Sequence, residues 1–281
     1  MIGTETLAIG LGLGSAMAWG AGDFAGGLAS RKGNMMGVVF TSQVLGGFFL
    51  AAMGLLAGEA VPPLHFMLYG ALAGVFGNMG LLALYRGLAL GRMGIVAPLS
   101  AVLTALVPVG YSMCSTGLPS GLQLAGMVFF LVAIWMLSAG EAEFKMTLEE
   151  LGLSVGAGLA FGLFFIFIDK ANDLAIFWPL VSARIASVGF LSTVLLVSRK
   201  PVGSMTGLWK LIIFVAVFDA LGNLLFSAAA QMGRLDISAV LGSLYPAATV
   251  ALAWVVLKER LGRKQWMGVA LAFVALVFIS V

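Results

Sequence analysis

Three ionisable side chains, Asp23, Arg184 and Asp219, lie within long apolar segments of the chain. A charge at the centre of a bilayer costs about 2.5–3.5 kcal/mol on insertion scales, so each of these side chains requires a partner or a function. Arg184 can pair with one of the two acids and serve only to fix helix packing. Alternatively, one acid is left over to bind a proton or an amine-bearing substrate, provided that all three side chains face one cavity.

Uncharged polar and aromatic side chains in the same segments are weaker candidates for such a cavity. Asn78 and Asn223 each follow a glycine and can either line the cavity or form interhelical hydrogen bonds worth about 0.6 kcal/mol. Aromatic residues suit a largely apolar pocket with a few polar groups, although in membrane helices they more often pack or anchor at the interface. The predicted substrate-binding residues are Trp19, Asp23, Gln43, Asn78, Tyr85, Arg184, Asp219, Asn223 and Tyr245.

The composition indicates that lipid surrounds the elements that carry these residues. The chain has 281 residues, of which 61% are hydrophobic and only 10% are charged, against roughly 25% charged residues in a soluble domain. One Cys and one His exclude a disulfide framework and a multi-His or multi-Cys metal site. The glycine clusters do not follow a strand, and a Walker lysine is missing, so we expect neither a cofactor nor an enzyme.

Ten stretches are long and apolar enough to cross a bilayer as helices, which requires about 20 residues each. We place them at 5–29, 35–57, 65–90, 94–115, 119–139, 148–169, 174–197, 207–231, 236–257 and 261–281. The predicted fold is therefore an all-α polytopic membrane protein with ten transmembrane helices.

The two halves of the chain resemble each other at a constant offset of 142 residues. Gly14 falls on Gly156, Gly20 on Gly162, and Gly91 on Gly233, and further identities continue into the tenth stretch without a gap. The second stretch fits least well, and its counterpart is shifted by a residue if it is present. Residues 1–140 and 141–281 are thus predicted to be five-helix repeats, and because five is odd, the second is inverted relative to the first.

Prolines and glycines in these stretches suggest where helices bend and where they touch. Pro98 in the fourth stretch and Pro246 in the ninth are predicted to interrupt equivalent helices and to act as gates, because proline removes a backbone hydrogen bond. Alternatively, these prolines have no gating role, because proline is frequent in membrane helices in any case. Small-xxx-small pairs predict close helix contacts at Gly22/Gly26, Gly70/Gly74, Gly152/Gly156 and Gly158/Gly162.

Several short motifs resemble those of a known transporter family. The segment LYRGLALGR at 84–92, followed by VAPL at 96–99, is similar to the third-to-fourth helix signature of EamA-type members of the drug/metabolite transporter superfamily. LYP at 244–246 and LKERL at 257–261 resemble the ninth-to-tenth helix signature. The resemblance extends over both halves and implies a ten-helix secondary carrier of small organic solutes, often an exporter of amino acids or related metabolites.

The distribution of Lys and Arg predicts how the chain crosses the inner (plasma) membrane. Of the 15 such residues, 12 fall in the loops that follow odd-numbered stretches and two fall on the other side, with Arg184 inside the membrane. The positive-inside rule places the odd loops in the cytoplasm and both termini outside. The family more often has both termini inside, so this orientation departs from its habit.

The sequence therefore predicts a secondary active transporter, more often an exporter, of a small organic metabolite such as an amino acid. One alternative is a multidrug or organic-cation exporter coupled to protons through an intramembrane carboxylate. Another is a membrane enzyme or a structural partner protein. The expected partners are a small-molecule substrate, the lipid bilayer and protons, with no nucleic acid, and the chain is expected to act as a monomer or homodimer.

Overall fold

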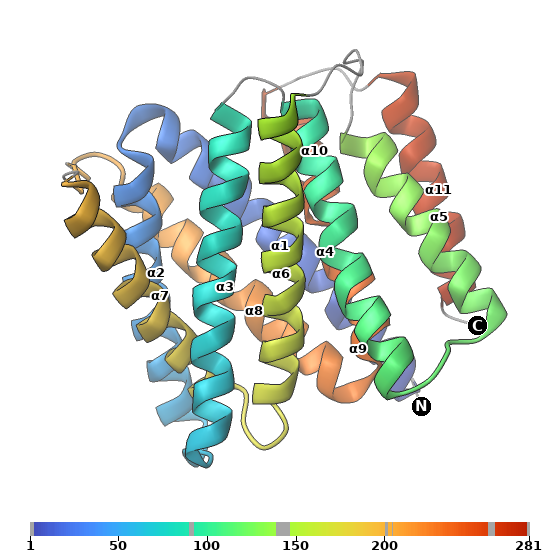
Figure 1. Cartoon of the computed structure of the whole chain (residues 1–281), viewed down its shortest axis with the longest axis horizontal. Helices are drawn as coiled ribbons and strands as arrows, with labels where there is room; N and C mark the ends of the chain where they lie inside the picture. The colour runs from blue at the N-terminus through green and yellow to red at the C-terminus, as the bar shows by residue number, and fades with distance from the viewer. Residues whose placement is uncertain are drawn as a thin grey trace.

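The computed structural model describes residues 3–89, 93–138, 147–199, 202–203, 205–257 and 262–279. In these ranges the regular secondary structure is entirely helical, as the composition predicted (Figure 1). The helices are α1 Thr4–Lys32, α2 Met35–Leu56, α3 Leu64–Ala89, α4 Met93–Ser115, α5 Gly121–Ser138, α6 Leu148–Ala171, α7 Phe177–Ser198, α8 Trp209–Met232, α9 Leu235–Gly242, α10 Tyr245–Leu257 and α11 Arg263–Ile279.

The described helices are those of a multi-pass membrane protein. Five of them, α2, α3, α6, α7 and α8, contain windows that are long and apolar enough to cross a membrane, and α4 and α5 contain shorter apolar segments. Large hydrophobic side chains such as Phe48, Leu56 and Leu196 are exposed on the outside of the bundle, where lipid rather than water can cover them.

The stretch expected to form the ninth helix is divided into α9 and α10, with Ser243 and Leu244 between them. Pro246 has no N–H to donate to the carbonyl group of Gly242, so the helical ladder cannot continue there. The N–H groups of Leu244 and Ala247 instead donate to carbonyl groups three residues earlier, Leu241 and Leu244.

The fourth helix is not interrupted at its proline as the sequence predicted. α4 continues from Met93 to Ser115 through both Pro98 and Pro108, so the expected interruption at Pro98 is absent. Membrane helices tolerate proline where neighbouring groups satisfy the freed carbonyl. The gating role of both prolines stays a prediction, and the side chain of Pro98 lies outside the described residues.

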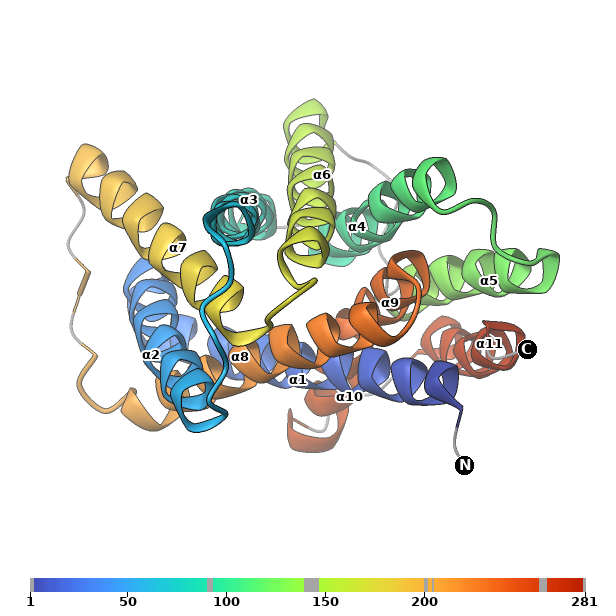
Figure 2. The same ribbon diagram turned by 90° about the horizontal axis from the view of Figure 1, so that it is seen from below.

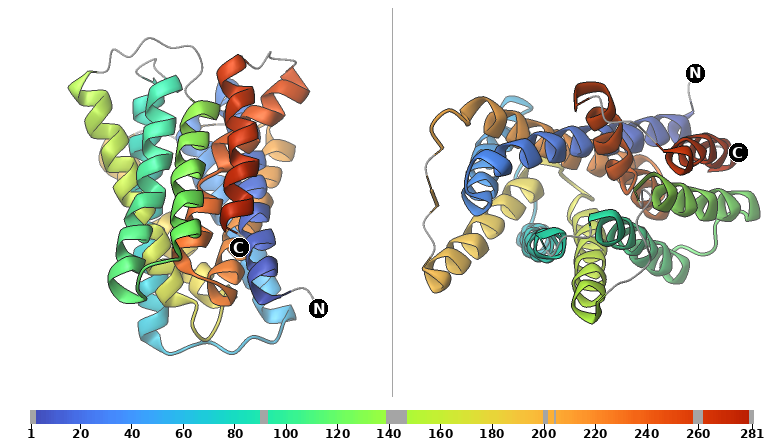
Figure 3. Two further views of the ribbon diagram at one scale, coloured as in Figure 1. Left: turned by 90° about the vertical axis from the view of Figure 1, so that its right-hand side faces the viewer. Right: turned by 90° about the horizontal axis from the view of Figure 1, so that it is seen from above.

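Helix packing pairs elements from the two halves of the chain. α1 lies along α8, α3 along α6, α2 against α7, and α5 beside α11 (Figures 2 and 3). Both termini lie at the same end of the bundle, where α1 begins, whereas α6 begins at the opposite end (Figure 1). Segments far apart in sequence therefore meet along the full length of the bundle.

Glycines allow some of these helices to approach until their backbones touch. A Cβ atom on Gly70 or Gly74 of α3 would overlap the backbone of Pro179 or Ala183 of α7, and one on Gly158 or Gly162 of α6 would overlap α4. The predicted contact at Gly152 and Gly156 is wrong for the described residues, none of which lies within 4 Å of a Cβ atom at either position.

Candidate functional site

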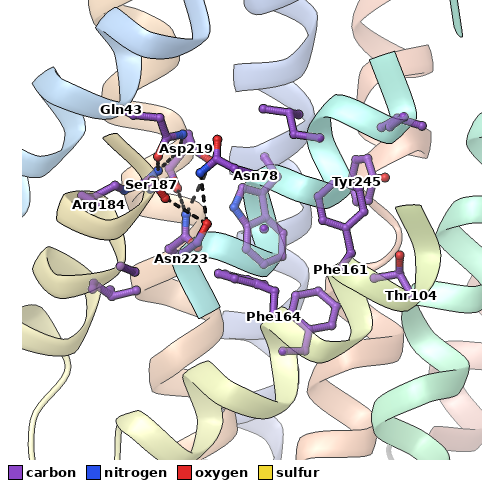
Figure 4. Close-up of a pocket in the computed structure, with 18 of the residues that line it drawn as sticks. Gln43, Asn78, Thr104, Phe161, Phe164, Arg184, Ser187, Asp219, Asn223 and Tyr245 are labelled. Carbon is purple, nitrogen blue, oxygen red and sulfur yellow. Dashed lines mark hydrogen bonds and ion pairs between the residues drawn. The ribbon is translucent and has the colours of Figure 1, made fainter. Parts of the chain in front are cut away.

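One cavity of about 140 Å³ lies in the middle of the bundle, between helices of both halves. Its lining comprises Trp19 and Asp23 of α1, Gln43 of α2, Gly74, Gly77, Asn78, Leu81 and Leu84 of α3, Thr104 of α4, Phe161, Phe164 and Phe165 of α6, Leu180, Ala183, Arg184 and Ser187 of α7, Asp219 and Asn223 of α8, and Tyr245 of α10. Polar side chains gather at one end of the cavity, and aromatic side chains lie at the other (Figure 4).

An ion pair between Arg184 and Asp219 anchors the polar end. Arg184 Nη1 lies 2.6 Å from Asp219 Oδ2 and donates to Gln43 Oε1 at 2.5 Å, while Gln43 Nε2 donates to the same carboxylate oxygen at 3.5 Å. The side chain of Arg184 is 8% exposed and that of Asp219 is 30% exposed. Three helices, α2, α7 and α8, are thus joined at one point.

Local sequence explains how α2 accommodates this arginine. Gly46 and Gly47 follow Gln43 by about one turn, and a Cβ atom on Gly47 would lie 3.2 Å from the Cβ atom of Arg184. A Cβ atom on Gly46 would come 3.8 Å from Arg184 Nε. The glycine pair therefore leaves the space through which the guanidinium group reaches Gln43.

The two asparagines use their amide groups in different ways. Asn78 Nδ2 donates to the carbonyl oxygen of Gly74 at 3.0 Å, which Ser187 Oγ also contacts at 3.1 Å. Asn223 Nδ2 donates to the carbonyl oxygen of Asp219 at 2.6 Å and lies 3.5 Å from its carboxylate. Both asparagines are buried and line the cavity, so they combine interhelical or local hydrogen bonding with a position at its wall.

Some of the polar groups at the cavity, among them Arg184 Nη2, Asn78 Oδ1 and the carboxylate of Asp23, have no partner within the described part of the chain. Arg184 Nη2 and Asn78 Oδ1 are buried and without a hydrogen bond, and their residues are 7% and 4% exposed. Asp23 is an exposed side chain of the cavity wall and forms no hydrogen bond or ion pair within the described ranges. Because a buried polar group without a partner costs about 1–3 kcal/mol, Arg184 Nη2 and Asn78 Oδ1 offer a donor and an acceptor to an occupant, and Asp23 adds a second acceptor.

Aromatic rings form the rest of the wall. Trp19 lies 5.7 Å from Phe165 and 5.8 Å from Phe226, centroid to centroid, and the two phenylalanines stack at 4.3 Å. Gly222 of α8 makes room for the indole, because a Cβ atom there would lie 2.7 Å from Trp19 Nε1. α1, α6 and α8 therefore hold the ring of Trp19 in one place at the cavity.

Eight of the nine predicted substrate-binding residues line this one cavity: Trp19, Asp23, Gln43, Asn78, Arg184, Asp219, Asn223 and Tyr245. The side chain of the ninth, Tyr85, lies outside the described residues. Pro246 follows Tyr245 at the start of α10 and is not among the lining residues. Whether any of the eight contacts substrate stays a prediction.

Sequence reasoning missed several lining residues. Ser187 lies about one helical turn after Arg184, and Phe161 lies 142 residues after Trp19, so helical spacing and the repeat offset pointed to both. Thr104, Phe164 and Phe165 are apolar or weakly polar residues in apolar helices, and nothing in the sequence distinguishes them from other core positions. Groups of three or more His, Cys, Asp or Glu side chains suited to a metal ion are absent from the described ranges.

Comparisons with known proteins agree with this architecture. A solved structure described only as "Crystal structure of protein" shares the fold, with a TM-score of 0.81 and 16% identity over 96% of this chain and 95% of the other. A search of curated proteins found no match. Residues 150–281 match the model of the EamA-like transporter family, which is the family that the motifs of both halves resemble.

Proposed function

We propose that this protein is a secondary active transporter that exports a small organic solute by alternating access between two inverted repeats, residues 1–140 and 141–281. In this proposal α9 and α10 together form one broken membrane span, which gives ten spans in total. Inverted repeats provide two conformations related by symmetry, each open to one side of the membrane.

The packing of the helices supports this repeat. In the proposed repeat, α1 corresponds to α6 and α3 corresponds to α8. The pair formed by α1 and α8 therefore has the pair formed by α6 and α3 as its equivalent, and both pairs pack extensively. The repeat also relates α2 to α7, and Gln43 and Arg184, which lie 141 residues apart, meet directly between these two helices. That offset fits the one-residue shift expected for the second stretch.

The proposed substrate rests on three polar groups that lack a partner in the described part of the chain: Arg184 Nη2, Asn78 Oδ1 and the carboxylate of Asp23. Arg184 Nη2 is placed to receive a carboxylate, whereas Asp23 and Asn78 Oδ1 are placed to receive an ammonium group. The aromatic wall beside them suits an apolar side chain. An amino acid or a related zwitterion satisfies all of these groups at once, and a cavity of about 140 Å³ suits a molecule of that size.

Asp23, rather than Asp219, is the acid left over for substrate or proton in this proposal. Arg184 already neutralises Asp219 at 2.6 Å. The same free carboxylate, in a cavity that Trp19 and Phe161 also line, favours a second candidate function, the export of hydrophobic organic cations, because aromatic faces attract cations. In that case Arg184 Nη2 has no role in binding.

Flux into or out of sealed proteoliposomes distinguishes these functions. We expect uptake of a radiolabelled apolar amino acid by the parent protein, a loss of at least ten-fold in Asp23→Asn, and little change in Glu5→Gln, which neutralises an exposed acid on the same helix. If the protein carries amino acids, Arg184→Gln should abolish their flux. If it carries organic cations instead, the same substitution should leave the flux of a cationic dye unchanged. Equal flux through Asp23→Asn and the parent contradicts both assignments.

The charge distribution supports an orientation with the odd loops in the cytoplasm and both termini outside. A reporter fused after Val281 that is active only in the cytoplasm tests it directly. Activity of that reporter would reverse the proposed orientation and leave the assignment of the cavity unchanged.

A further inference from the structure

A carboxylate outside the cavity joins the two halves of the chain at one end of the bundle. Glu59 lies in the loop between α2 and α3, and its Oε1 accepts a hydrogen bond from the backbone N–H of Ile176 at 2.7 Å. Its Oε2 accepts from Phe177 N at 2.8 Å and from Trp178 N at 3.1 Å. Trp178 Nε1 donates to the backbone carbonyl of Glu59 at 2.7 Å. We call these four hydrogen bonds the Glu59 latch.

The latch supplies what the N-terminus of α7 lacks. The first N–H groups of a helix have no partner within the helix and carry a partial positive charge, so an anion is favourable there. The residue before α7, Ile176, has no side chain that can cap it. α7 therefore depends on a side chain from the first half of the chain, and hydrogen bonds to a charged acceptor are the stronger kind.

The latch lies at the end of the bundle where α3 and α7 are in closest contact. Beyond Glu59, the backbones of the two helices touch at Gly70 and Pro179, and Ser182 Oγ donates to the carbonyl of Met67 at 2.7 Å. Toward the opposite end, α7 diverges from α3 (Figures 1 and 2). The latch thus fastens α7 to the loop before α3 at the end of the bundle where these two helices are closest.

The equivalent loop in the second half has no such carboxylate. An offset of 142 places Pro201 at the position of Glu59, and residues 198–218 contain neither Asp nor Glu. The helix that this loop would fasten, α2, is capped by its own Asn34, whose Oδ1 accepts from Gly37 N at 3.1 Å. The N-termini of α7 and α2 are therefore capped by different chemistry, the first by a carboxylate from the other half of the chain and the second by its own asparagine.

We propose that the Glu59 latch is a gate, which holds one end of the carrier closed and must open and re-form in each transport cycle. The inference rests on the proposed alternating-access function. Because the latch exists at one end alone in the described part of the chain, removing it shifts the carrier toward the conformation that is open at the loop between α2 and α3.

Pulsed electron–electron spin resonance on the full-length protein in proteoliposomes tests the gate. Spin labels are attached at Ala57→Cys and Leu174→Cys, which are exposed positions on either side of the latch, after Cys114→Ser removes the exposed native thiol. We expect one dominant distance without the further substitution. Glu59→Gln keeps the shape but loses the charge, and should raise the fraction of longer distances at least three-fold.

Glu149→Gln is the matched control, because it also replaces a partly exposed acid by its amide. Glu149 pairs with Arg86 at 2.9 Å near the start of α6, at the opposite end of the bundle. This substitution should leave the distance between Ala57 and Leu174 unchanged. If Glu59→Gln gives insufficient folded protein, Trp178→Phe removes one of the four hydrogen bonds and should shift the distances in the same direction.

Flux measured on the same samples separates the two proposals. Altered distances together with a change of at least three-fold in flux support the gate. Distances in Glu59→Gln and Trp178→Phe that match those of Glu149→Gln, in a protein that transports, overturn it. Absence of flux in the unsubstituted protein counts against the carrier function, whereas the distances still decide whether the latch holds this end closed.

Discussion

The contact between α3 and α7 at Gly74 allows a prediction whose magnitude follows from interatomic distances. A Cβ atom on Gly74 would lie 2.7 Å from the carbonyl carbon of Ala183 and 2.8 Å from its Cα atom. Ordinary contacts of this kind begin at 3.4 Å, and the carbonyl oxygen of Ala183 lies closer still to this Cβ atom, so Gly74→Ala must separate the helices by more than about 0.7 Å. That movement also stretches the hydrogen bond from Ser187 Oγ to the carbonyl of Gly74.

The expected cost is the difference between two opposing effects. Overpacking in a close contact costs about 1–3 kcal/mol, and loss of one hydrogen bond adds about 0.5–1.5 kcal/mol. Alanine in place of glycine returns up to about 1 kcal/mol through helix propensity. The free energy of unfolding should therefore fall by about 1–3 kcal/mol.

Thermal unfolding in detergent, followed by tryptophan fluorescence, measures this change. Gly156→Ala in α6 is the matched control, because a Cβ atom there would meet no described residue within 4 Å. It keeps the propensity gain without the overlap, so its melting temperature should equal or exceed that of the parent, while Gly74→Ala melts several degrees lower. Equal melting temperatures for the two variants would refute the backbone contact between α3 and α7.

Three further substitutions probe other features. Asp219→Asn leaves the buried Arg184 without its anion and should lower the free energy of unfolding by about 2 kcal/mol. This loss is smaller than for a fully buried pair because Asp219 is partly exposed. Asp173→Asn, at an exposed position, should have no effect in the same melting assay. Thr147→Ala removes the capping box with Glu150 and should cost about 0.5–2 kcal/mol by thermal unfolding, and no loss would contradict the capping geometry. Pro246→Ala restores an N–H for the carbonyl of Gly242, so hydrogen exchange at residues 243–247 should slow; unchanged exchange would mean that packing alone breaks the helix.

The membrane-spanning segments could be predicted from the sequence because their signal is local. A run of about 20 apolar residues must be helical in lipid, since every backbone N–H and C=O requires a partner within the segment. The bounds of α2, α4 and α6 accordingly lie close to the predicted stretches. The break between α9 and α10 lies where Pro246 predicted an interruption, whereas α4 continues through Pro98, because the neighbours of a proline decide whether a helix breaks there.

The candidate site was predictable only in part. Asp23, Arg184 and Asp219 stand out in any apolar sequence because of the energy that burying a charge requires. Phe164 and Phe165 carry no such signal, since a phenylalanine that lines a cavity is indistinguishable in sequence from one that packs in the core. Glu59 is the one charged residue in the loop at 57–63, but its partners lie 117 to 119 residues away along the chain, so the sequence does not point to them.

The sequence by itself determined that this protein lies in a membrane and which residues are costly to bury there, because composition does not depend on folding. The repeat that relates its halves stays a prediction. Which acid pairs with Arg184, which remains free at the cavity, and which carboxylate caps α7 were decided only by the tertiary structure. Those outcomes depend on distances of a few ångströms between helices from opposite halves of the chain, and packing of glycine-bearing surfaces, rather than any local preference, sets these distances.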